Sequence, residues 1–265
     1  MFSVQDFFYY INLIGYDKLK KWYFTDLPGN IYIKYFMHFA VRELPPNIGV
    51  RSIKDKGGNG YNMNEVDEKK NTPLHYAATL GHFEIARALI ENGARVDTQG
   101  KHDRSPLQLA CLNGHVDVVK LLIENYACIN LKDDRGLTAL HIAVDEHEAD
   151  IVKVLLEHGA NLDAKDEFQM TALHYAAKLG LVEISNILIK EGASVYAKDH
   201  NDYSPLVTAA INGPHLDVIE ILTKQMRKIE ILTKEVRKNS RMHDLTVRYG
   251  PYGEGDTDDE SDKHL

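Results

Sequence analysis

The histidines of this chain recur at a regular spacing, and they are the residues most suited to chemistry. His75, His141 and His174 each end the same four-residue pattern, in which Thr is followed by Pro or Ala, then by Leu and His. Neutral imidazole is a common metal ligand, so a recurring histidine raises the hypothesis of a metal site. The three histidines belong to separate copies of the pattern, however, and stacked copies would hold them about one repeat apart. We therefore interpret them as structural residues and predict no metal site.

Two other patterns that begin like catalytic or cofactor motifs are incomplete. His147 and Glu148 start like the helix of a zinc protease, but Ile151 stands where the second ligand is needed. The glycine-rich stretch 57–60 lacks the Gly-Lys-Ser/Thr that completes a phosphate-binding loop. No Gly-x-Ser-x-Gly elbow occurs. We predict that the chain is not an enzyme and that it binds no cofactor.

The elements that would position the histidines follow from a repeat. The wider pattern that contains these histidines returns in five copies, three of which keep the histidine, and the copies start at residues 72, 105, 138, 171 and 204, each 33 residues after the last. Thr or Ser at each start suits the N-cap of a short helix, and Pro suits the first helical position. A Gly then ends this helix, and a second, apolar helix follows and ends at another Gly. Each copy therefore predicts a pair of short helices.

This period and this motif resemble the ankyrin-repeat family. The resemblance implies an all-α solenoid of helix-turn-helix pairs with β-hairpin loops. The segments outside the repeats add a helical N-terminal cap and an extended C-terminal helix to the predicted fold. In the family the repeated histidine links neighbouring loops, and the three histidines match that role. Gln108 and Val207 depart from it, Tyr126 and His147 stand where Gly is expected, and Pro214 looks like a one-residue insertion.

Composition divides the chain into five segments. The first holds 13 of the 23 aromatic residues and is too apolar for a solvated tail. We interpret it as two or three short helices that cap the solenoid, with a docking surface for a membrane or a partner as the alternative. The predicted segments are an aromatic-rich helical segment (1–45), a loop or decayed repeat (46–60), the ankyrin-repeat domain (61–226), a C-terminal helix extension (227–249) and a disordered acidic tail (250–265).

A shorter duplication lies near the C-terminal end. Residues 219–228 are followed at once by a near copy, 229–238, in which eight of ten positions are identical. The first copy belongs to the second helix of the last repeat, so the second copy should lengthen that helix with one face apolar. We predict a C-terminal cap, because the stretch is too short for a coiled coil, although a basic amphipathic helix also resembles a calmodulin target. The helix leaves self-association open, but we expect a monomer.

The formal net charge of −8 argues against a nucleic-acid-binding protein, which would usually carry a basic face. No run reaches the roughly 18 to 20 apolar residues of a membrane span. Cys111, which replaces a core alanine, and Cys128 imply no disulfide framework and favour a reducing compartment. We expect a cytoplasmic protein, and a secreted effector that acts in a host cytosol would look the same.

The resemblance also implies where a partner would bind. In the family, contacts come from the hairpin tips just before each capping Thr or Ser and from the end of the first helix. Carrying these positions over gives the candidate protein-binding residues Leu80, Lys101, His102, Arg104, Leu112, Arg135, Leu137, Phe168, Met170, Lys178, Leu179, His200 and Tyr203. A solvent-facing tip favours polar residues, so Leu137, Phe168, Met170 and Tyr203 are the exceptions. They either tuck against neighbouring hairpins or form an exposed apolar patch, and we favour the patch.

We therefore predict a non-enzymatic protein–protein interaction module that binds another protein on its concave face. Phe168 and Tyr203 would anchor the partner, with Arg104, Arg135 and Lys178 as polar surroundings. The alternative is a membrane-associated or targeting protein, anchored by the aromatic N-terminus, with the repeats as receptor or spacer. The partner's identity cannot be read from the sequence, because a fold does not specify a function.

Overall fold

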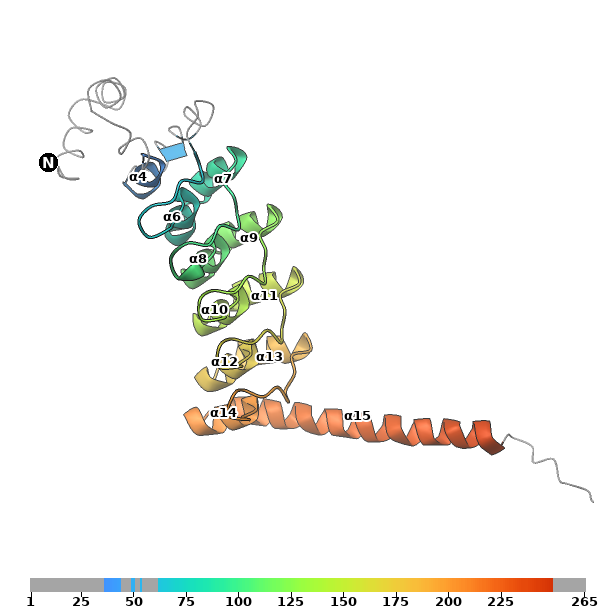
Figure 1. The fold of residues 1–265 in the computed structure, drawn as a ribbon. Helices are drawn as coiled ribbons and strands as arrows, with labels where there is room; N and C mark the ends of the chain where they lie inside the picture. Colours follow the sequence, from blue (N-terminus) through green and yellow to red (C-terminus); the bar gives the residue numbers. More distant parts are fainter. Residues whose placement is uncertain (1–35, 44–48, 51–52, 54–61, 250–265) are drawn as a thin grey trace, which may run out of the picture. The chain divides into compact units, whose positions relative to one another are not determined.

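The computed structural model describes residues 36–43, 49–50, 53 and 62–249, and its regular structure is helical (Figure 1). The predictions for most of the N-terminal aromatic segment and for the acidic tail lie outside the described residues. The chain divides into two compact units, residues 1–134 and residues 135–265. Each unit is a row of helix pairs, and each is described by itself.

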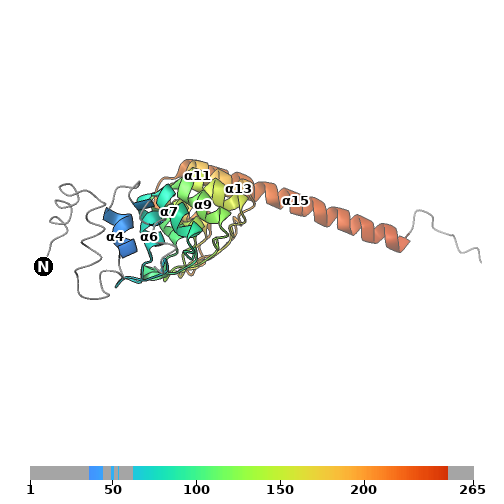
Figure 2. The ribbon, with the colours of Figure 1, turned by 90° about the horizontal axis from the view of Figure 1, so that it is seen from above.

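The first unit places its first helices in one layer and its second helices in another (Figures 1 and 2). In the first layer α4 packs against α6 and α6 against α8, while in the second layer α7 packs against α9. Within a repeat, α6 packs on α7 and α8 on α9. The elements are α4 (Phe36–Glu43), α6 (Pro73–Leu80), α7 (Phe83–Glu91), the short 3-10 helix η1 (Lys101–Asp103), α8 (Pro106–Leu112) and α9 (Val116–Glu124).

The second unit repeats this arrangement. Its first helices pack in the order α10, α12, α14, and its second helices in the order α11, α13, α15. The helices are α10 (Ala139–Asp145), α11 (Ala149–Glu157), α12 (Ala172–Leu179), α13 (Val182–Lys190), α14 (Pro205–Asn212) and α15 (Leu216–Tyr249). Both units therefore show the helix-pair stacking expected of an ankyrin-repeat solenoid.

The loops between repeats are hairpin-shaped turns, and no β-strand occurs within the described ranges. The first such turn is closed by a backbone hydrogen bond from Asp67 N to Asn71 O (3.0 Å). Its counterpart in the second unit is the bond from Asp166 N to Met170 O (3.1 Å). A second bond within each turn, from Lys70 N to Asp67 O and from Gln169 N to Asp166 O (both 3.0 Å), completes a hairpin shape without a ladder.

The core of each repeat is made of a leucine and small residues on the first helix. In α12, Leu173, Ala176 and Ala177 are all 0% exposed. Because alanine side chains are small, α10 and α14 can both pack closely against α12. Cys111 takes the place of an alanine in α8 and is also fully buried, as the sequence predicted.

The repeated histidines cap the first helices and connect each repeat to the next. Thr72 N donates to His75 Nδ1 (3.0 Å), so the proton of the neutral ring sits on Nε2, which donates to Arg104 O (3.1 Å). In the second unit His141 and His174 make the same bonds, the latter with Tyr203 O at 3.1 Å. The linking role implied by the family resemblance is thus confirmed.

Gln108 shows that a glutamine side chain can replace the histidine ring in this role. Its Oε1 accepts from Ser105 N (2.8 Å), and its Nε2 donates to Leu131 O (3.1 Å). The glutamine therefore caps α8 and still reaches the following loop, without a group that titrates near neutral pH.

A further histidine extends the pattern toward the N-terminus. His38 on α4 donates from Nε2 to Asn71 O (2.8 Å), and Asn71 directly precedes the capping Thr72, as Arg104 precedes Ser105. Thus α4 stands where the first helix of a preceding repeat would stand. The sequence interpretation assigned these residues to the N-terminal cap and left the decayed repeat to residues 46–60.

Left-handed backbone ends most of the helices. Gly81 and Gly180 have φ of 67° and 70°, and Tyr126 and His147, which replace glycines, still adopt φ of 64° and 63°. Gly213 stands where the repeat pattern predicts the Gly that ends the first helix of the last copy as a left-handed cap, and this prediction was wrong. Its φ of 162° is extended, because Pro214 follows it and adds one residue before the next helix.

Two equivalent histidine contacts show how the chain accommodates the inserted residue. His115 Nε2 donates to Thr79 O, 36 residues earlier, whereas His215 Nε2 donates to Lys178 O, 37 residues earlier, both at 3.0 Å. The extra residue is absorbed in the turn and the contact survives. After it α15 runs for 34 residues, which confirms the predicted extension of the last helix.

The buried histidines make stability depend on pH. Burial is the main cause that lowers the pKa of His75 from 6.5 to about 4, and it also lowers the pKa of His174. The unfolded ring takes up a proton first as pH falls, so the stabilisation is complete above about pH 6.5 and is lost progressively toward pH 4. We expect His75→Gln to reduce the loss of unfolding free energy over this window by about 1 to 3 kcal/mol.

Urea denaturation at a series of pH values would measure this slope, with the exposed His102→Gln as the control. An unchanged slope in His75→Gln would show that the His75 ring is not the group responsible.

Candidate protein-binding surface

A buried aspartate shapes the hairpin that leads into α12. Asp166 is 3% exposed, and its Oδ1 accepts from the backbone N–H groups of Phe168 (3.0 Å) and Met170 (2.8 Å). Its Oδ2 accepts from the Tyr175 hydroxyl at 2.8 Å. Burial and the neighbouring Asp166 carboxylate raise the pKa of Tyr175, so the hydroxyl stays a donor at neutral pH. These hydrogen bonds of Asp166 therefore hold the backbone of the hairpin tip that carries Phe168.

The next hairpin is built in the same way without the tyrosine. Asp199 Oδ1 accepts from the backbone N–H groups of Asn201 (2.8 Å) and Tyr203 (2.9 Å). Asp202 at its tip has φ of 61°, as Gln169 has φ of 59° in the preceding hairpin. Both tips therefore turn tightly, and the short polar side chain of Asp202 tolerates this left-handed conformation well.

Three aromatic rings are exposed on these two hairpins. Phe168 is 45% exposed and Tyr203 is 42% exposed. His200 N donates to Phe168 O (3.0 Å), and the two rings lie 5.9 Å apart, tilted by 47°. We call Phe168, His200 and Tyr203 the hairpin patch.

The predicted residues around the hairpin patch differ in how exposed they are. Lys178 and Arg135 are exposed, while Met170 and Leu179 are half-buried. Leu137 is only 4% exposed, so its expected place in an exposed patch was wrong. At the same position before the capping Thr or Ser, Met170 is half-buried and Tyr203 is exposed, so Leu137 lies deeper than its counterparts.

The remaining predicted residues belong to the first unit. Leu80 (43% exposed), Lys101 and His102 are exposed, and Leu112 is half-buried. Arg104 is half-buried because its Nε lies 3.4 Å from the buried Asp133 Oδ2.

The hairpins of the first unit enclose a shallow hollow of about 420 Å³. Lys69, Lys70 and Lys101 line it, but so do Glu68 and Asp134. His102 Nδ1 lies 3.0 Å from Asp134 Oδ2, so basic and acidic groups face each other there. The hollow is polar and mixed in charge, unlike the aromatic hairpin patch.

The hairpin aspartates were not among the predicted residues, although the sequence carries a signal for them. Asp67, Asp133, Asp166 and Asp199 each precede a capping Thr or Ser by five residues, whereas Gly100 takes that place in the second copy. A side chain at this fixed distance can accept from the backbone of its own turn, which is the usual role of aspartate in turns.

The described part of the chain holds no cluster of three His, Cys, Asp or Glu side chains that could bind a metal ion. Neither Cys111 nor Cys128 forms a disulfide within the described residues. Among the described residues, no helix is long and apolar enough to cross a membrane. What the arrangement offers is a set of side chains on rigid hairpins.

Comparison with known families agrees with this geometry. Residues 37–133, 92–166, 129–199 and 160–235 each match the family model for ankyrin repeats in three copies, so the matches together span residues 37–235. The chain belongs to the ankyrin-repeat family. Ankyrin repeats generally mediate protein–protein interactions, and the family module is typically non-catalytic.

Two curated relatives share part of this ankyrin-repeat chain. Ankyrin repeat domain-containing protein 13B from Mus musculus and from Homo sapiens are each 33% identical to it over 73 residues. That stretch is 26% of this chain and 10% of either relative, so the chain spans about a tenth of the length of the curated relatives it matches.

Substitution of the buried Asp166 would test whether its hydrogen bonds position the hairpin patch. We expect Asp166→Ala to lower the free energy of unfolding by about 2 to 3 kcal/mol, because it leaves two backbone donors and the Tyr175 hydroxyl without their acceptor. Urea denaturation would measure this change, and Glu167→Ala, at the exposed neighbouring position, is the matched control. Equal stability of the two variants would contradict the role given to Asp166.

Proposed function

We propose that this ankyrin-repeat protein is a non-enzymatic interaction module that holds another protein on its concave face, with the hairpin patch as the main anchor. The observation that carries the proposal is the exposure of Phe168 and Tyr203 at positions where turns usually place polar residues. Aromatic side chains are enriched in the buried centres of protein interfaces.

Rigidity supports the patch as an anchor. Asp166 and Asp199 hold the backbone of both tips, and the carbonyl of Tyr203 is bonded to His174. A partner would therefore order little backbone on binding, which reduces the entropic cost of association. Lys178 and Arg135 would supply a polar rim around the rings.

The first-unit residues are a second, separate part of the proposal. Leu80 offers exposed apolar surface at the end of α6, and Lys101 and His102 offer charge on the neighbouring hairpin. We place the protein in the cytosol, where free thiols such as Cys128 persist. The alternative of membrane attachment rests on the aromatic N-terminus, most of which lies outside the described residues.

Paired substitutions test the hairpin patch. We expect Phe168→Ala/Tyr203→Ala to weaken binding of a protein captured by the wild type at least about tenfold, because truncated aromatic anchors typically cost 2 kcal/mol or more. The partner would be captured from a cytosolic lysate, identified, purified and titrated against each variant by calorimetry. Tyr126→Ala/Val182→Ala, which also removes two exposed apolar side chains, is the matched control.

Circular dichroism would confirm that all variants are folded. Unchanged affinity in the Phe168/Tyr203 variant, or equal losses in both pairs, would exclude the hairpin patch as the anchor.

A further inference from the structure

Asparagine directly precedes glycine at three positions that the structure describes, and a fourth such pair, 59–60, lies outside the described residues. In such a pair the backbone nitrogen of the glycine can attack Cγ of the asparagine, because glycine has no Cβ to hinder the approach. Ammonia leaves, a succinimide ring forms, and water opens the ring at either carbonyl to give aspartate or isoaspartate. The net reaction consumes one water, releases one ammonia and needs no enzyme. The described pairs are Asn92 and Gly93, Asn113 and Gly114, and Asn212 and Gly213.

The three asparagine side chains are held alike. In Asn92, Asn113 and Asn212, Nδ2 donates to the carbonyl oxygen four residues earlier, at 2.8 Å in each case. Asn113 and Asn212 are both exposed, and Asn92 is half-buried. The carbon that is attacked therefore belongs to an amide with the same hydrogen bond in all three pairs. What differs between the pairs is the glycine nitrogen.

The glycine N–H groups of the three pairs are bonded differently. Gly93 N and Gly114 N each donate to the carbonyl oxygen three residues earlier, at 3.0 Å and 3.3 Å. Gly213 N donates no hydrogen bond to any residue that the structure describes. The longer turn with Pro214 holds Gly213 extended with φ of 162°, whereas Gly93 and Gly114 are left-handed with φ of 89° and 70°. Attack at the first two sites therefore requires a hydrogen bond to break first, and attack by Gly213 N does not.

We propose that Asn212 is a site of spontaneous chemical modification, where Gly213 N closes on the Asn212 amide and water converts the residue to aspartate or isoaspartate. Exposure alone does not select this site, because Asn113 is exposed as well. The unbonded N–H of Gly213 selects it. The inference is independent of the proposed interaction function, since neither residue belongs to the hairpin patch.

The product alters the turn between α14 and α15. Conversion removes the amide group that donates to Thr208 O and leaves a carboxylate at the C-terminal end of α14, where the helix dipole disfavours negative charge. Isoaspartate also adds one carbon to the main chain before Gly213. That carbon falls in the turn that carries His215, whose Nε2 donates to Lys178 O at 3.0 Å. Modification of Asn212 therefore weakens the end of α14 and the contact of His215 with the preceding repeat.

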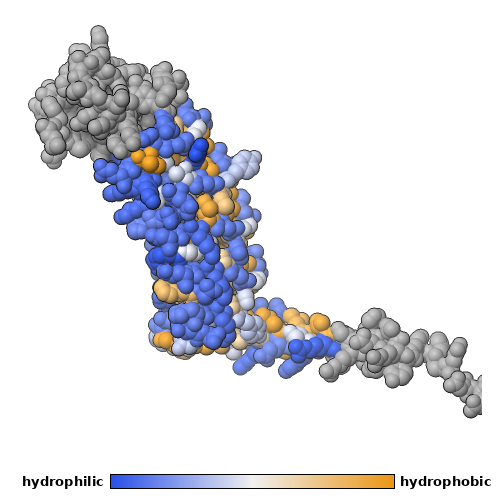
Figure 3. Space-filling view, in the orientation of Figure 1, coloured by the Kyte–Doolittle hydropathy of each residue, from blue (hydrophilic) through white to orange (hydrophobic). Residues whose placement is uncertain are grey.

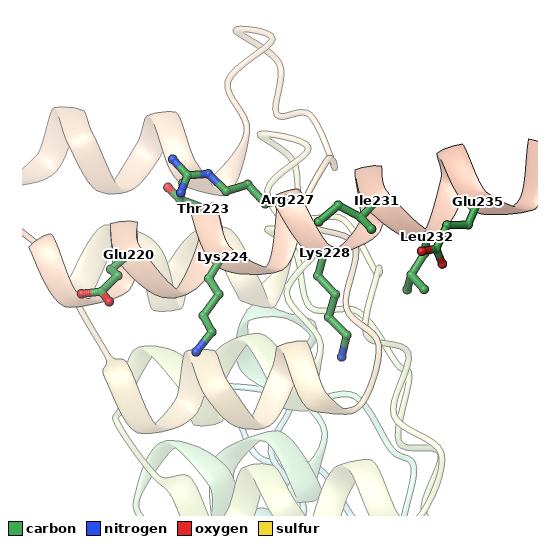
Figure 4. Close-up of a pocket in the computed structure, with 8 residues that line it drawn as sticks. All are labelled: Glu220, Thr223, Lys224, Arg227, Lys228, Ile231, Leu232 and Glu235. Carbon is green, nitrogen blue, oxygen red and sulfur yellow. The ribbon is translucent and has the colours of Figure 1, made fainter.

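This turn lies directly before the part of α15 that anchors the long helix. Of the residues of α15 whose side chains are described, only Val218 and Leu222 are buried, and both lie near its start. Further along, Figure 3 shows apolar residues on the part of α15 that runs past the stacked helices. Ile231 and Leu232 are 58% and 51% exposed there and line an open hollow of about 770 Å³ (Figure 4). Because the anchoring residues directly follow the turn, a weakened turn loosens the attachment of α15.

Ageing of the full wild-type chain tests the site. Conversion raises the mass of the affected peptide by about 1 Da, so peptide mass spectrometry follows each pair separately in samples kept at neutral pH. We expect Asn212 to convert at least about fivefold faster than Asn92 or Asn113, because their glycines must first give up a hydrogen bond. Raising the pH should speed conversion of Asn212, since the attacking nitrogen must lose its proton. Equal rates at the three sites would overturn the proposal.

Two controls separate the effect of the turn from that of the local sequence. In guanidinium chloride the three rates should converge, because each asparagine then precedes a glycine in an unfolded chain. A lead of Asn212 that persists there unchanged would contradict the role given to the turn. Deletion of Pro214 restores the spacing of 36 residues that His115 has to its acceptor and should slow Asn212 to the rate of Asn113. An unchanged rate in a folded deletion variant would also overturn the proposal.

Gly213→Ala serves as a second variant if the deletion variant does not fold. Extended φ admits alanine, and a Cβ built on Gly213 lies 3.0 Å from His215 Nε2, so the ring needs to move only slightly. The added methyl group should slow conversion of Asn212 several-fold. Aged wild type should also unfold at a lower urea concentration than fresh protein, whereas an Asn212→Ser chain aged alongside it should not. Equal losses in the two aged chains would exclude Asn212 as the cause.

Discussion

A neutral imidazole that caps one helix and bonds to the loop of the next repeat is the interaction on which each stack depends. Repeats in a solenoid contact only their neighbours, so order must be passed from one repeat to the next. His75 and His174 do this with a ring that accepts on Nδ1 and donates from Nε2. The bond is made to a backbone carbonyl, so it places no demand on the side chain of the residue that accepts it.

Because the histidine bonds to a backbone carbonyl, the side chain of the accepting residue can vary, and this connects the fold with the candidate binding surface. The accepting carbonyls belong to the residues just before the helix caps, and these include Arg104, Met170 and Tyr203. The backbone of each is held by the preceding repeat, while its side chain differs in size, charge and depth. A fixed frame with variable side chains is how loops on a rigid scaffold come to carry binding. The hairpin aspartates act alike, because they bond to backbone N–H groups and leave the tip side chains undetermined.

The repeat positions could be predicted because a strict period fixes helix starts, caps and the buried leucines together. His38 escaped prediction because it lies 37 residues before His75 rather than 33, and the insertion hides its register. The depth of Leu137 could not be read either, since burial in a hairpin depends on how far a side chain turns inward. Gly213 was misjudged because its conformation is set by Pro214 and not by its own freedom. The candidate surface followed from position in the repeat, whereas the exposure of each side chain needed the fold.

The long final helix follows from the loss of one turn. Met226 occupies the place that Gly192 takes in the preceding repeat, where φ is 100° and the chain leaves the helix. Glycine is not required for this turn, because Tyr126 follows α9 at the same repeat position with φ of 64°. After Met226 the backbone stays helical, and the duplicated segment carries α15 onward. The same change leaves the last repeat without the turn and the next helix pair that would have covered its apolar face.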